Sequence, residues 1–127
     1  MIYLDSTLLK LEAILAGAVA ANQPEAHVHF REIPSQTKPT FEEYLGATKR
    51  TATNGANDVT ICAAPGAAGR TRNIDTVSIY NKDTANVTVT VKTDDGTTEF
   101  IIRKQLLAPG ESLCYEGRES GRGWYVA

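Results

Sequence analysis

Residues 86–91 read Asn-Val-Thr-Val-Thr-Val, and this stretch decides the fold class. Its valines alternate with polar residues, so in an extended chain their side chains would all leave the same face. Strict alternation of β-branched residues is typical of a strand with one buried face. Asp94-Asp95-Gly96 then supplies a turn, because Gly96 can take a positive φ at no steric cost. Since residues 98–103 resume a strand pattern, we predict an antiparallel hairpin over residues 85–104.

Other short alternating or apolar runs, bounded by Gly, Pro or Asn, predict further strands. The run 9–15 fits a helix as well as a strand, and we choose a strand because a glycine and an Asn-Gln-Pro sequence punctuate it. Residues 72–81 have a mixed pattern, in which regular alternation places Ile74 and Val77 on opposite faces. We expect the remaining strands at residues 9–15, 26–33, 59–63, 72–81, 112–116 and 123–126.

About eight short strands separated by turns indicate one all-β domain, built as a β-sandwich or a jelly-roll-like fold. The chain has 127 residues, of which 42% are hydrophobic and 22% are charged, so it can bury a single core. We therefore expect residues 1–127 to form one β-sandwich domain with one long loop that carries a short helix.

The composition argues against several classes of partner. The 13 Lys and Arg residues are mixed with 15 Asp and Glu residues, so no clustered positive surface for nucleic acid is expected. No apolar run approaches the roughly 20 residues that cross a bilayer, and the start lacks the basic residues of a signal peptide. Cys62 and Cys114 lack metal-site and redox-motif spacing, so we expect buried thiols, with a disulfide between them left open. These features predict a protein made in the cytoplasm that binds neither nucleic acid nor membrane.

Two segments favour an interaction role. Residues 1–7 begin with Met-Ile-Tyr-Leu and form a candidate N-terminal arm, with the first strand of the sandwich as an equal alternative. Residues 34–57 form a long polar surface excursion. Within it, Thr40 and Glu43 have the capping-box spacing of a short helix that Gly46 would end. Because exposed aromatic and arginine side chains are enriched at interfaces, the candidate contact residues are Met1, Ile2, Tyr3, Leu4, Phe41, Tyr44, Lys49 and Arg50.

Candidate chemistry is confined to one histidine pair. His27 and His29 project from the same face of the predicted strand, and Glu32 lies near enough to be a third metal ligand. In a jelly roll this arrangement is similar to the metal motif of cupins, which would make the chain a metal enzyme. Cupins, however, place their glutamate further along and use another histidine on a later strand, whereas this chain has only two histidines. The alternative is a pair of solvent-facing or interface histidines, so we assign no catalytic, cofactor-binding or metal-binding residue and expect no enzyme.

Stretches along most of the chain resemble a group of small structural proteins from tailed bacteriophages. The resemblance covers the beginning, the middle and the end of the chain, but not residues 34–50. Its motifs are structural rather than catalytic, so they identify a scaffold better than a task. The resembling stretches are Met1–Thr7, Leu15–Val19, Asn22-Gln23, Asn57–Thr60, Ala63–Pro65, Val77–Thr84, Leu107–Leu113 and Gly123-Trp124.

The resemblance implies a virion component on the capsid surface. Its expected role is that of a cement or decoration protein, a jelly-roll-like homotrimer that clamps neighbouring subunits of the major capsid protein. The mechanism would be multivalent burial of surface across capsomer junctions. A tail or fibre module that binds a host surface glycan is the alternative within virions, and a cupin-like metal enzyme is the alternative from another class.

Overall fold

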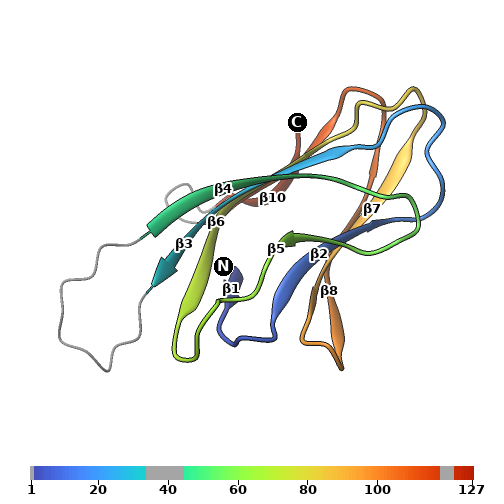
Figure 1. Ribbon diagram of the computed structural model, residues 1–127. Helices are drawn as coiled ribbons and strands as arrows, with labels where there is room; N and C mark the ends of the chain where they lie inside the picture. Colours follow the sequence, from blue (N-terminus) through green and yellow to red (C-terminus); the bar gives the residue numbers. More distant parts are fainter. Residues whose placement is uncertain (1, 34–44, 118–121) are drawn as a thin grey trace.

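Two packed antiparallel β-sheets make up residues 2–33, 45–117 and 122–127, which are the residues that the computed structural model describes (Figure 1). Those residues include no helix, so the all-β sandwich expected from the sequence is confirmed. No helix in them is long and apolar enough to span a membrane. The strands are β1 (Ile2–Leu4), β2 (Lys10–Leu15), β3 (Glu25–Ile33), β4 (Leu45–Ala52), β5 (Val59–Cys62), β6 (Thr71–Tyr80), β7 (Val87–Asp94), β8 (Glu99–Leu107), β9 (Ser112–Glu116) and β10 (Gly123–Val126).

Sheet A has the strand order β10-β9-β6-β3-β4, and β1 pairs with β6 beyond the end of β9. Sheet B has the order β5-β2-β7-β8. The hairpin predicted over residues 85–104 is confirmed as β7 and β8, which pair from Val87 opposite Leu107 to Asp94 opposite Glu99. All of the other strands predicted from the sequence are also present, and 9–15 is a strand rather than a helix.

The hydrophobic core lies between the two sheets. The three alternating valines of β7 are buried, while the threonines between them lie on the outer face of sheet B. Leu11, Ala13 and Leu15 of β2 add a second buried row beside them. Facing them from sheet A are Val28, Phe30, Ile74, Val77, Ile79, Leu113 and Tyr115. Each side chain of this size contributes about 1.5–3 kcal/mol when it is fully buried.

A β-bulge in β6 explains its mixed sequence pattern. Thr76 pairs with His29 and Ile74 pairs with Phe30, so Asp75 is an extra residue without a partner in β3. The extra residue restores Ile74 to the core face that Val77 and Ile79 already occupy, and the side chains of these three residues are buried. The prediction that Ile74 and Val77 lie on opposite faces is therefore wrong, because regular alternation does not cross a bulge.

Of the two alternatives for the start of the chain, an N-terminal arm over residues 1–7 or the first strand of the sandwich, the described residues form the strand. Ile2 and Leu4 are 8% and 0% exposed, because β1 pairs with β6 and both side chains point into the core. Tyr3, between them, points outward and is exposed. Met1 lies outside the described residues. Of this predicted contact segment, the structure therefore leaves Tyr3 on the surface and makes its two neighbours part of the sandwich.

The surface excursion expected over residues 34–57 is replaced in its second half by a strand. Residues 45–52 form β4, which pairs with β3 over its whole length, with Gly46 opposite Arg31. The end of the predicted helix at Gly46 is therefore wrong, because its backbone belongs to the ladder of sheet A. Phe41 and Tyr44, like the rest of 34–44, lie outside the described residues.

Both cysteines are free thiols. Cys62 is buried in β5, as expected from the sequence. Cys114 is only half-buried, because it alternates with the core residues Leu113 and Tyr115 along β9 and so faces outward. The open question of a disulfide is thus settled in favour of two separate thiols.

Candidate interaction surfaces and a charged cluster

A buried polar corner at Asn81 and Asp83 joins segments that lie far apart in the sequence. The Asp83 carboxylate accepts hydrogen bonds from the backbone N–H groups of Ala20, Ala21 and Asn22 at 2.8–3.0 Å. It also accepts one from Thr84 N–H at 2.9 Å. These donors lower the pKa of Asp83 to about 2, because each of them stabilises the ionised form.

Asn81 ties the same corner to the end of β8. Its side-chain amide donates to the carbonyl oxygens of Ala85 and Leu107 at 3.0 and 3.1 Å. Its Oδ1 accepts a hydrogen bond from the backbone N–H of Asp83 at 3.0 Å. Because the side chains of Asp83 and Asn81 bond to backbone partners, the corner has a structural role.

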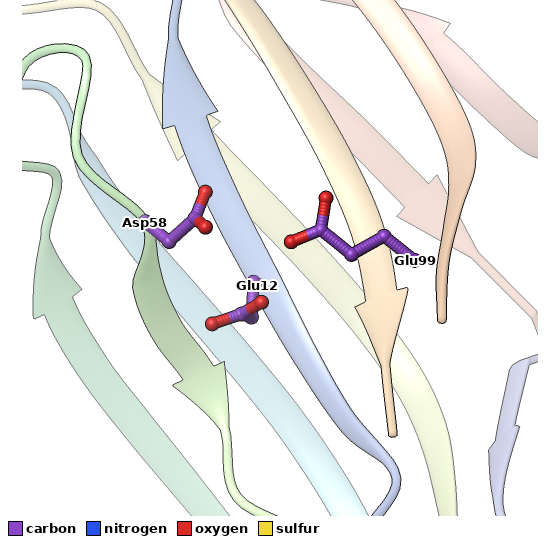
Figure 2. Close-up of side chains that lie close together, drawn as sticks. All are labelled: Glu12, Asp58 and Glu99. Atoms are coloured by element: carbon purple, nitrogen blue, oxygen red, sulfur yellow. The ribbon is translucent and has the colours of Figure 1, made fainter. Parts of the chain in front are cut away.

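A charged cluster lies on the outer face of sheet B, where Glu12, Asp58 and Glu99 converge from β2, the approach to β5, and β8 (Figure 2). One carboxylate oxygen of each lies within 4.8 Å of the others. Lys92 Nζ of β7 lies 2.8 Å from Asp58 Oδ1 and 2.8 Å from Glu99 Oε1. These contacts raise the pKa of Lys92, so the ammonium is the resident cation of the cluster.

Glu12 is the strained member of the cluster. Its side chain is buried, and Oε1 has no hydrogen-bond partner, while Oε2 lies 3.3 Å from Lys10 Nζ. Burial raises the pKa of Glu12, because desolvation penalises its charged form. Because the single ammonium of Lys92 bridges the carboxylates of Asp58 and Glu99, the cluster is an ion-pair network on the outer face of sheet B.

The predicted ligand set of His27, His29 and Glu32 does not come together. The two histidines lie on the outer face of sheet A, where His29 Nδ1 is 3.1 Å from Thr48 Oγ1. Glu32 instead accepts hydrogen bonds from Arg70 at 3.0 Å and Arg72 at 3.1 Å. These cations lower the pKa of Glu32 against the opposing effect of its burial, which by itself would raise it. The two histidines thus lie on the surface of sheet A, whereas Glu32 is bound by two arginines.

The β4 strand is exposed on both of its faces. Ala47 and Lys49 pair with the buried Phe30 and Val28, so they point toward the core side of sheet A, yet both are exposed. Arg50 points to the opposite face and is exposed as well. β4 thus extends past the cover of sheet B and offers Lys49 and Arg50, two of the predicted contact residues, to solvent. Tyr3 does not join them, because β6 and β3 lie between β1 and β4.

The β8 strand carries three of the seven exposed large hydrophobic side chains in the described part of the chain. Phe100, Ile101 and Leu106 are 63%, 68% and 56% exposed. These residues were not identified from the sequence, where 98–103 was predicted only as the second strand of a hairpin. Apolar residues on an edge strand can indicate an interaction surface, and this pattern could have identified them.

No protein-family model, no curated protein and no solved structure matches this chain. Within the described residues, the candidate interaction surfaces are therefore the edge strands β4 and β8, both of which carry exposed side chains.

Proposed function

We propose that this chain is a structural protein of a bacteriophage virion, which binds and stabilises the shell of the major capsid protein. The sequence resemblance supports the virion setting. The observation of the structure that carries the proposal is β4, an edge strand whose residues 46–50 are all exposed. A sandwich that presents, among its described residues, an edge strand with exposed side chains is suited to docking on a neighbouring subunit.

Binding at β4 would use two physical effects. An extended segment of a capsid subunit can add to the free edge of β4 through main-chain hydrogen bonds. Lys49 and Arg50 would select an acidic surface and speed the encounter with it. Each contact can be weak, because many copies bound across one shell act together.

The setting is tested by counting copies of the chain in purified virions of the phage that encodes it, by quantitative mass spectrometry and cryo-EM. We expect hundreds of copies on the shell. A few copies confined to the tail would instead indicate the tail or fibre module, and absence from virions would overturn the proposal.

The contact is tested with capsids that lack the protein, by co-sedimentation. We expect the Lys49→Glu/Arg50→Glu variant to lose about tenfold or more in affinity, which is about 1.4 kcal/mol. Lys104→Glu is the matched control, because it reverses the charge of an exposed lysine on the other edge strand, β8. Unchanged binding of the β4 variant, with the chain on the shell, would place the contact elsewhere.

A further inference from the structure

The free edge of β8 lies apart from β4 in the fold. Within the described residues only β7 pairs with this nine-residue strand, so its other edge has no neighbouring strand. β4 lies beside β5, whereas β8 is at the opposite end of sheet B. Figure 1 shows β4 and β8 on different sides of the sandwich. A partner on β8 therefore leaves the β4 edge available.

A second β-bulge determines which side chains of β8 share a face. Val91 pairs with Arg103 and Lys92 pairs with Ile101, so Ile102 is an extra residue. Ile102 packs against the core, on the inner face together with Arg103. The β8 residues that pair with outer-face residues of β7 also point to the outer face. They are Glu99, Ile101, Lys104 and Leu106.

This arrangement is self-complementary under two-fold symmetry. We propose that β8 pairs antiparallel with β8 of a second copy of this chain, about an axis between Ile102 and Arg103. Ile101 then lies opposite the partner's Lys104, and Glu99 lies opposite the partner's Leu106. In this register the two side chains of each opposing pair point to the same face of the joined sheet, because the bulge shifts the alternation by one residue.

Charge and apolar area both favour this register. Glu99 is diagonal to the partner's Lys104, at a separation of about 7–8 Å between backbones that long side chains can span, and symmetry creates the pair twice. Ile101 is diagonal to the partner's Leu106, so the exposed apolar side chains of the outer face cover each other. The pairing joins two four-stranded sheets into one continuous sheet and leaves β8 of neither copy with a free edge.

The inference stands apart from the capsid proposal, because it needs only the purified full chain. The experiment is sedimentation velocity and light scattering over a concentration series at low and high salt. We expect a dimer that dissociates on dilution. Ile101→Lys and Lys104→Glu should each weaken it about tenfold or more, while Lys49→Glu, the matched exposed lysine of β4, should leave it unchanged.

The outcomes separate the possibilities. A dimer lost in both β8 variants, with a far-UV spectrum like that of the wild type, supports the pairing. A trimer would support the assembly that the resemblance implies and would overturn two-fold pairing through β8. A chain that stays monomeric at every concentration would also overturn it, and would mean that the bulge and the charges keep this edge unpaired. Capsid binding that survives in the Lys104→Glu variant keeps the two proposals distinguishable.

Discussion

Asp83 shows how one buried charge can hold distant parts of a chain together. Its carboxylate accepts backbone hydrogen bonds from residues 20–22, which lie about sixty positions earlier in the sequence. Because the donors are backbone N–H groups, no neighbouring side chain in the sequence signals the contact. The Asn-Lys-Asp-Thr stretch could therefore be recognised as a turn, but its partner segment could not be predicted.

The Asp83→Asn variant should be less stable than the wild type, with a midpoint of thermal unfolding lower on the order of several degrees. The amide brings N–H donors to a site that offers only donors, so it cannot replace the carboxylate. Because its pKa is lowered, the carboxylate stabilises the fold fully at pH values above the ordinary aspartate pKa of 3.8. That stabilisation is lost as the pH falls toward the lowered pKa of about 2. Thermal melts between pH 7 and 2 should show the two proteins converging at the acid end. Asp5→Asn, at an exposed aspartate, is the control, and a constant difference at all pH values would contradict this account.

At the scale of the strand, β1 decides between two alternatives that the sequence left open. The apolar start of the chain was a candidate arm, yet Leu4 is fully buried against β6. Leu4→Ala should cost about 2–5 kcal/mol in the free energy of unfolding, because it leaves a cavity in the core. Tyr3→Ala should cost much less, since that side chain points to solvent. Denaturant unfolding measures both variants, and equal effects would show that β1 detaches as a unit.

Deviations from regular strands set the limit of what alternation could predict. Val87, Val89 and Val91 follow a perfect period of two, so β7 and its buried face were predicted correctly. The bulges at Asp75 and Ile102 change the period by one residue, and no local residue type marks them. The bulge at Ile102 also affects the candidate interaction surface, because it decides which β8 side chains face outward. Sequence reasoning found the strand but not its exposed apolar side.

At the scale of the whole molecule, the fold class and the number of layers followed from the sequence, but the strand order did not. Order depends on pairings between distant segments, such as β4 with β3 and β1 with β6. β4 in particular has Gly, Ala, Thr, Lys and Arg in place of an apolar row. It is a strand because β3 offers it a complete ladder, and its exposure is what makes it a candidate contact surface.

The two free thiols provide a measure of how the sandwich opens as a whole. Cys62 of β5 is buried in the core between the sheets, and this burial raises the pKa of its thiol. Cys114 is half-buried on the outer face of sheet A. A thiol reagent should therefore label Cys114 in the native protein and Cys62 only after unfolding. Labelling of Cys62 should depend on denaturant as steeply as global unfolding, measured with the Cys114→Ser variant. A shallow dependence would show instead that β5, an edge strand of sheet B, opens locally while the rest of the sandwich stays folded.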